Sequence, residues 1–181
     1  MKALRRFLVD DSGSATIELL FVLPIITFIF MAAAEASLFM MRHVMLERSV
    51  DLVVREIRLG RLDGTTHAAL KRLICQQGVM EVEQTCVDSM RIWMQPISTV
   101  NFAMVVPPHN CIDRTEDIES IQEPTGTEFA YGVDNNIMLL RICLKEKPMF
   151  PLAALGARMI ADETDGHYAL VTTSVFVNEP D

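Results

Sequence analysis

The pattern of hydrophobic and polar positions divides the chain into an apolar N-terminal part and a mixed C-terminal part. Residues 19–34, LLFVLPIITFIFMAAA, carry no charge, and the apolar run extends over residues 17–41 with Glu18 and Glu35 as its only charged residues. A helix of this length can cross a hydrocarbon core of about 30 Å at about 1.5 Å per residue. The pattern therefore predicts a membrane-spanning helix near the N-terminus.

The helical pattern continues beyond the apolar run. Apolar residues recur there at the four-three-four spacing of an amphipathic helix, at Leu46, Val50, Val53 and Ile57. The first residue after Pro24 that favours a helix end is Gly60, and helices embedded in lipid tolerate a proline, which can kink them. We therefore expect one long helix from Ser14 to Leu59, apolar in its first half and amphipathic in its second.

After Gly60 the pattern predicts a mixed domain over residues 61–181. Thr65 or Thr66 can cap a helix that Gly78 closes. Strand-like alternation or apolar runs follow at residues 90–95, 101–106, 137–144 and 168–177. The sequence of residues 151–161 predicts a short apolar helix or turn. A segment of this kind is more often part of a protein core than a second contact with the membrane. The expected fold class is α+β, with a small antiparallel sheet packed on the long helix.

Composition limits the classes of function. The chain has 181 residues, of which 50% are hydrophobic, and a net charge of −8. The apolar fraction is high enough for a packed core, and the negative charge argues against nucleic acid as a partner. No nucleophile elbow, zinc-protease helix or phosphate loop is present, so we expect neither an enzyme nor a bound cofactor.

Two further features bear on metals and on the redox environment. Residues 113–128 carry six acidic residues against one arginine but lack the spacing and central glycine of a calcium loop, so a surface loop is expected. The cysteines are even in number and contain no metal-binding pair; they are Cys75, Cys86, Cys111 and Cys143. In an exported domain two disulfides are expected, with Cys75–Cys86 and Cys111–Cys143 favoured among the three pairings. In the cytosol the same cysteines would remain thiols.

The apolar segment is compatible with three kinds of N-terminus. It can be a secretory signal peptide cut near Ala36, an uncleaved signal anchor, or a prepilin leader cut before the helix. The third alternative involves cleavage after Gly13, which makes Ser14 the new N-terminus and Glu18 the fifth residue of the mature chain. A carboxylate there can pair with the α-amino group of a neighbouring subunit, since both charges need neutralising in lipid.

Residues 13–39, GSATIELLFVLPIITFIFMAAAEASLF, resemble the N-termini of the TadE-like minor pilins and pseudopilins of the tight-adherence (Flp-type) branch of type IV pili. In that family a glycine precedes the cut, a glutamate is the fifth mature residue, a proline follows, and a second glutamate ends the apolar run. The matching positions here are Gly13, Glu18, Pro24 and Glu35.

The other end of the chain adds to the resemblance. Residues 176–180, FVNEP, are similar to the way in which many TadE-like chains finish. Two positions depart from the family pattern: Leu19 stands where an aromatic residue often follows the glutamate, and Ser14 replaces the more usual alanine. Both departures leave in place the groups that the chemistry needs.

The resemblance implies a pilin-like architecture and a life cycle. Residues 1–13 would be a leader removed by a prepilin peptidase, residues 14–60 the long helix, and residues 61–181 a periplasmic domain. The subunit would lodge in the bacterial inner membrane, meet the assembly platform and join other pilins through Glu18. It would then start or cap the fibre at the cell surface. Glu35 would lie at the far membrane interface, where a carboxylate is well tolerated. The rival interpretation is an exported binding or sensor domain, anchored or released near Ala36.

Overall fold

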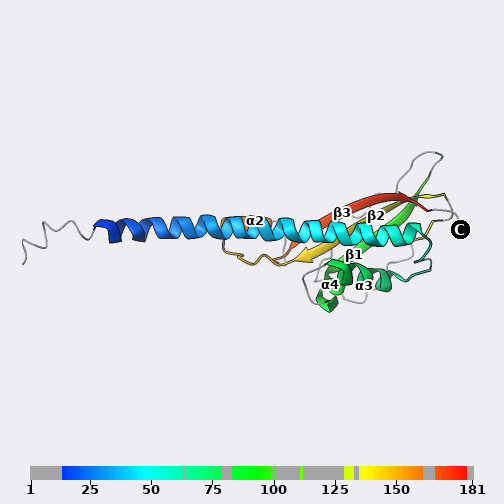
Figure 1. Ribbon diagram of the computed structural model, residues 1–181, viewed down its shortest axis with the longest axis horizontal. Helices are drawn as coiled ribbons and strands as arrows, with labels where there is room; N and C mark the ends of the chain where they lie inside the picture. The colour runs from blue at the N-terminus through cyan, green and yellow to red at the C-terminus, as the bar shows by residue number, and fades with distance from the viewer. Residues whose placement is uncertain are drawn as a thin grey trace, which may run out of the picture.

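The structure, a computed structural model, describes residues 14–62, 64–78, 83–98, 100, 111, 129–132, 135–160 and 166–178. One long helix runs the length of the molecule, and all other described elements gather around its second half (Figure 1). The elements in chain order are α2 (Ser14–Arg58), α3 (His67–Gly78), α4 (Glu83–Ser89), β1 (Met90–Ile97), β2 (Ile137–Glu146), α6 (Ala154–Met159) and β3 (Tyr168–Val177).

Helix α2 matches the long helix expected from the sequence. It is 45 residues long and continues through Pro24. It ends where glycine permits a left-handed backbone: Gly60 has a φ of 67° and its N–H donates to the carbonyl of Ile57 at 3.0 Å. The N–H of Arg61 donates to the carbonyl of Glu56 at 3.2 Å, which completes a Schellman cap. The local signal at Gly60 is therefore sufficient to end a helix that packing alone would not stop.

The sheet has three antiparallel strands in the order β1-β2-β3. Strand β2 is central, as its almost wholly apolar sequence indicated, and it pairs Leu140 with Met94 of β1 and with Ser174 of β3. The expected strand over 101–106 lies outside the described residues, and so does the acidic segment 113–128. The prediction of an α+β fold, with a long helix packed on a small antiparallel sheet, is confirmed.

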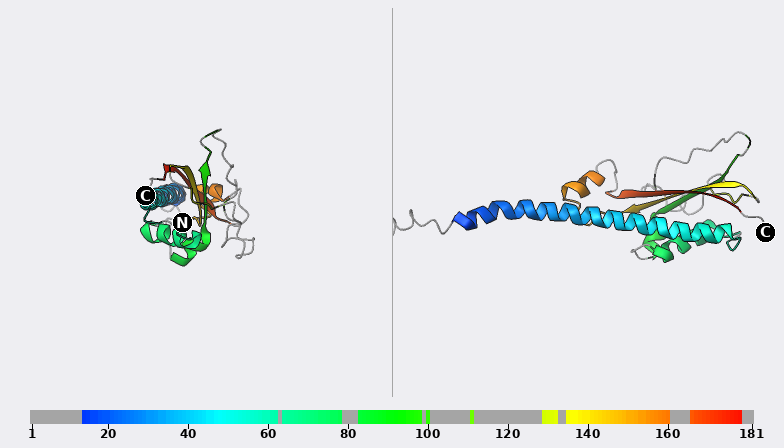
Figure 2. Two further views of the ribbon diagram at one scale, coloured as in Figure 1. Left: turned by 90° about the vertical axis from the view of Figure 1, so that its right-hand side faces the viewer. Right: turned by 45° about the horizontal axis from the view of Figure 1, so that its top comes forward.

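The core lies between α2 and one face of this sheet, and Figure 2 shows the helix running along the strands. All four apolar positions predicted for the amphipathic half of the helix are buried: Leu46, Val50, Val53 and Ile57. They belong to the same core cluster as alternate residues of β1 and β2, such as Ile92 and Leu140, as the two-residue period of a strand requires. Burial of this stripe holds the domain against the helix.

Helices α3 and α4 cover a further side of the core. Thr66 caps α3, because its hydroxyl oxygen accepts the N–H of Ala69 at 3.3 Å. At the other end, a side chain on Gly78 would press against the carbonyl oxygen of Met45, so the glycine allows α3 to approach α2 closely. Helix α4 was not predicted, because seven residues are too short to show a helical period.

Two disulfides cross-link the domain. Cys75 of α3 is bonded to Cys86 of α4, and Cys111 to Cys143 of β2. This is the pairing favoured by the sequence analysis. The first bond holds α4 against α3, and the second attaches Cys111 to the central strand.

Burial of the charged side chain of Lys71 in α3 lowers the stability of the fold, and this effect can be tested. Its side chain is 3% exposed, and burial lowers its pKa from 10.5 to about 8, an effect that Asp88 opposes and Arg91 adds to. Since the unfolded chain keeps the higher pKa, it binds more protons between about pH 8 and 10.5, and stability should rise with pH across that window. At neutral pH the penalty is fully present.

We therefore expect Lys71→Met to raise the free energy of unfolding by about 1–3 kcal/mol at neutral pH. The gain should shrink as the pH rises from about 8 and approach zero only well above 10.5, where the parent lysine is neutral in both states. Denaturant titration of the full chain in detergent, followed by the emission of Trp93, measures both values. Arg72→Met, at the exposed neighbouring position, is the control. A gain that does not depend on pH would contradict the electrostatic explanation.

Candidate functional site

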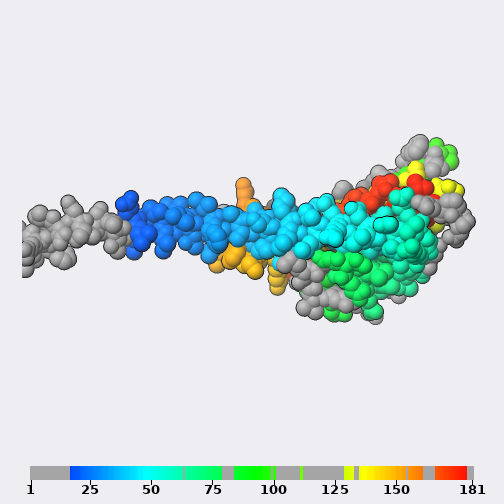
Figure 3. All heavy atoms as spheres, in the orientation of Figure 1, coloured from blue at the N-terminus to red at the C-terminus, as the bar shows by residue number. Residues whose placement is uncertain are grey.

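The first half of α2 is an apolar helix surface that no other described element covers. Every residue from 17 to 30 is exposed, and Figure 3 shows this part projecting from the rest of the molecule. Among the described residues, one helix is long and apolar enough to cross a membrane, and this is α2. Water is a poor solvent for such a surface, so the exposed half requires a lipid or protein environment.

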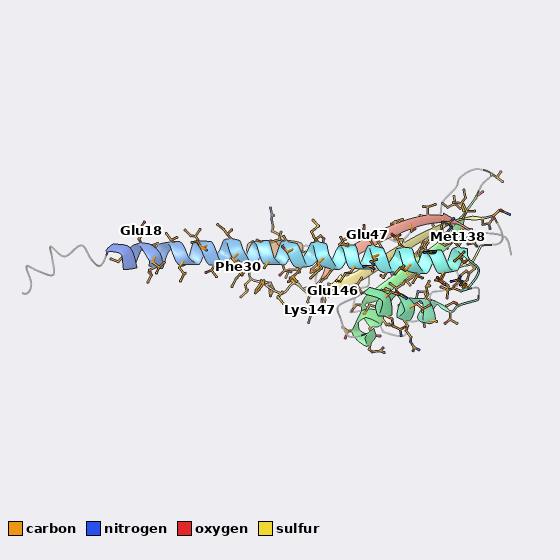
Figure 4. All side chains as sticks on the ribbon, in the orientation of Figure 1. Glu18, Phe30, Glu47, Met138, Glu146 and Lys147 are labelled. Atoms are coloured by element: carbon orange, nitrogen blue, oxygen red, sulfur yellow. A yellow bond between two sulfur atoms is a disulfide. The ribbon has the colours of Figure 1, made fainter. Side chains whose placement is uncertain are left out.

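The residues predicted to act in processing and docking lie on this half. Ser14 is the first residue of α2, and Gly13 lies outside the described residues. Glu18 is exposed and lies about 26 Å before Glu35 along the axis, at about 1.5 Å per residue. Figure 4 shows Glu18 close to the end of the helix, far from the folded domain. Its carboxylate is therefore available to a group that is not part of the same folded unit.

Glu35 is integrated into the fold more closely than the sequence suggested. We expected an acid at the membrane interface, where a carboxylate is well tolerated, but its side chain is 0% exposed and enclosed by the protein. One carboxylate oxygen accepts the N–H of Met149 at 3.2 Å, and the other accepts the N–H of Phe150 at 2.8 Å. Hydrogen bonds to an ionised acceptor are stronger than those between neutral groups. Glu35 therefore connects α2 to the segment after β2.

Arg42 makes a second connection, two helical turns further on. Its guanidinium donates to the carbonyl of Lys147 at 2.9 Å and to the hydroxyl of Tyr168 at 2.7 Å. It also lies 3.5 Å from a carboxylate oxygen of Glu146, whose side chain is buried. Figure 4 shows Glu146 and Lys147 close to α2, at the end of the domain that faces the bare half of the helix. We call this set the junction: Glu35 and Arg42 of α2, and residues 146–150.

The junction continues the apolar stripe of α2 with polar residues. Phe39, whose ring lies 5.5 Å from that of Tyr168, falls between Glu35 and Arg42 at the same three- and four-residue spacing that leads on to Leu46. The apolar pattern of the sequence predicted a buried face beginning at Leu46 and missed Glu35 and Arg42. Their spacing places them on that same face, and a charged residue on the buried face of a helix requires a partner.

The segment after the junction folds back on itself. The N–H of Ala153 donates to the carbonyl of Phe150 at 3.0 Å, and α6 begins at the next residue. A side chain on Gly156 would collide with the backbone carbonyl of Phe150, so the tight packing of α6 on this turn requires glycine. Leu152 stands at the tip of the turn and is 96% exposed.

The arrangement of charged groups points to attachment. Within the part of the chain that the structure describes, no three His, Cys, Asp or Glu residues are grouped so as to hold a metal ion. The charged side chains of the junction bind backbone groups and one another. These residues fix the folded domain on one face of α2 and at one position along it.

No family model, curated protein or solved structure matches this chain. The resemblance to the TadE-like family is therefore carried by residues 13–39 and 176–180 of the sequence alone.

Glu35→Gln tests the junction. An amide side chain keeps one acceptor oxygen but places an NH₂ group against one of the two backbone N–H groups. Since a hydrogen bond to a charged acceptor contributes about 1.5–3 kcal/mol, exchange of the amides of Met149 and Phe150 should accelerate by about tenfold or more. Hydrogen exchange of the full chain in detergent measures this. Glu47→Gln, at an exposed position of the same helix, should leave both amides unchanged; equal protection in both variants would mean that Glu35 does not hold the segment.

Proposed function

We propose that this chain is a minor pilin or pseudopilin that takes part in assembling a tight-adherence type IV pilus, at its initiation or tip complex. The observation that carries the proposal is the division of α2: its first half is bare, apolar and bears Glu18, while its second half is built into a disulfide-bonded domain. A subunit that assembles through its N-terminal helix needs this division, because the docking surface must stay uncovered.

Glu18 is the residue proposed to make docking specific. After cleavage behind Gly13 it would be the fifth residue and lie just inside the apolar segment. An unpaired carboxylate is unfavourable there, and the α-amino group of a neighbouring mature subunit is a cation at matching depth. The pair would favour one relative height of two helices, which apolar packing by itself specifies weakly.

The junction supports the same proposal from the other side. Glu35 and Arg42 hold the domain to α2 through backbone and side-chain groups, so a helix docked in the membrane also determines where the domain stands. The two disulfides suit an oxidising compartment such as the periplasm. Partners of this subunit would be other pilins, a prepilin peptidase and the inner-membrane assembly platform.

The mature N-terminus distinguishes this proposal from its rivals. We expect the intact mass of membrane-extracted protein from its native host to correspond to residues 14–181, because a prepilin peptidase would cut behind Gly13. A chain starting at Ser37 would indicate a secretory signal peptide and a released binding domain. A chain that keeps Met1 would indicate a signal anchor. Either of these results would reject the pilin assignment.

Glu18→Gln tests the docking role. The change should spare insertion and leader cleavage but weaken co-purification with co-expressed pilins, because it leaves the neighbour's α-amine unpaired at low dielectric. The expected loss is about a hundredfold in the association constant. Cross-linking and cleavage can be followed on the same gel.

The matched control is Glu47→Gln, since Glu47 is an exposed acid on the covered half of α2. Glu35→Gln is unsuitable as a control because that carboxylate holds the junction. Unchanged association of the Glu18→Gln variant would leave Glu18 as an acid that reaches the headgroups, without a role in assembly.

A further inference from the structure

An exposed apolar turn lies where the bare half of α2 meets the domain. Leu152 and Met149 are 96% and 60% exposed, although Ala153 between this turn and α6 is buried. Single exposed hydrophobic residues are common on soluble proteins and need no explanation by themselves. What distinguishes this turn is its position along α2.

The junction fixes that position. Because the amides of Met149 and Phe150 bind the carboxylate of Glu35, the turn must lie beside this part of the helix. The right-hand view of Figure 2 shows α6, in orange, alongside α2 at the boundary between its bare and covered halves, and α6 packs against α2. The burial pattern agrees: residues 17–30 are all exposed, and partial burial begins at Met31.

The apolar run begins at Ile17, after Ser14, Ala15 and Thr16, and the bare part of this run is too short to cross a bilayer without the region beside the turn. Residues 17–30 rise about 21 Å along the axis, at about 1.5 Å per residue. A hydrocarbon core is about 30 Å thick, so a spanning α2 needs about six further residues within the membrane. Those residues are the ones beside which the turn and α6 are packed. If α2 spans the bilayer, the turn therefore lies at the same depth in the membrane as the last residues of the spanning segment.

We propose that residues 147–159, here called the α6 turn, dip into the leaflet on the side of the exported domain. Leu152 and Met149 contact the upper acyl chains, while the long side chains of Lys147 and Arg158, both exposed, reach the headgroups. The occupant of this surface is the lipid of the same bilayer that α2 crosses. The α6 turn is thus a second membrane contact, which fixes the height and the facing of the domain.

The construction of the junction fits this depth. A carboxylate among acyl chains is strongly unfavourable unless its oxygens find donors within the protein. Glu35 is fully buried and each of its oxygens accepts a backbone N–H from the α6 turn itself. The turn therefore shields the one charged residue that the last part of the span contains. Gly156 keeps the turn compact enough to do so.

The proposal depends on α2 spanning a bilayer and is independent of the pilin assignment. A protein partner seated on Leu152 is the competing explanation. Lipid is favoured because the apolar surface of the turn continues that of the helix, at a depth set by the Glu35 hydrogen bonds. In vesicles that contain only this chain and lipid, the two explanations give opposite results.

The chain has one tryptophan, which allows a depth measurement by fluorescence. In a Trp93→Phe background, tryptophan is introduced at Leu152, at Phe30 in the bare half, or at Val100. Val100 is a matched control because it is 93% exposed, close to the value for Leu152, and lies beyond the end of β1. Each full-length variant is reconstituted in phosphatidylethanolamine and phosphatidylglycerol vesicles that contain lipid brominated near the headgroup end of its acyl chains. Unaltered disulfides and an unaltered melting transition confirm the fold.

We expect Leu152→Trp to lose at least as large a fraction of its emission as Phe30→Trp, and Val100→Trp to lose none. If Leu152→Trp loses no more of its emission to the brominated lipid than Val100→Trp does, the proposal is overturned. If Phe30→Trp is not quenched either, α2 does not span the bilayer and the premise of the proposal fails. Because tryptophan itself favours interfaces, the unaltered chain is also cross-linked with a lipid that carries a diazirine on its acyl chain. Adducts on residues 149–152, as well as on 17–30, support insertion, whereas adducts on 17–30 alone exclude it.

Discussion

The carboxylate of Glu35 and the two backbone amides that it binds determine how the folded domain is attached to the helix. Further along α2 the buried contacts are mainly apolar, and the hydrophobic effect that stabilises them is non-directional. Hydrogen bonds have direction, and a buried carboxylate that lost them would be strongly destabilised. This interaction therefore selects one register of the domain along α2, which Arg42 reinforces two turns away.

The register has consequences for both ends of the molecule. On the membrane side it leaves residues 17–30 bare, so that an apolar surface with Glu18 near its start is available to other helices or to lipid. On the domain side it lets Leu46, Val50, Val53 and Ile57 face the sheet. The proposed docking of pilin subunits and the proposed insertion of the α6 turn both depend on this division, but each uses a different part of it.

The disulfides stabilise parts of the domain that the α2 contact does not reach. Cys75–Cys86 joins two short helices, and the second bond attaches Cys111 to the central strand. A small domain with a three-stranded sheet buries limited apolar surface, and cross-links reduce the entropy of its unfolded state. Its stability thus depends in part on these two cross-links.

Periodic features were determined by the sequence itself. The length of the apolar run, the spacing of Leu46 to Ile57 and the stop at Gly60 predicted α2 to within one residue. Alternation located β1, a nearly continuous apolar run located β2, and a run rich in β-branched residues located β3. These patterns depend only on neighbours along the chain. The expected docking residue Glu18 also follows from local sequence. The partners of Glu35 and Arg42 were decided by the tertiary structure, since Met149, Phe150 and Tyr168 are more than a hundred residues away. Their contribution is largely backbone N–H and carbonyl groups, which every residue carries. No side-chain pattern marks them, so only the folded chain could show which ones meet the helix.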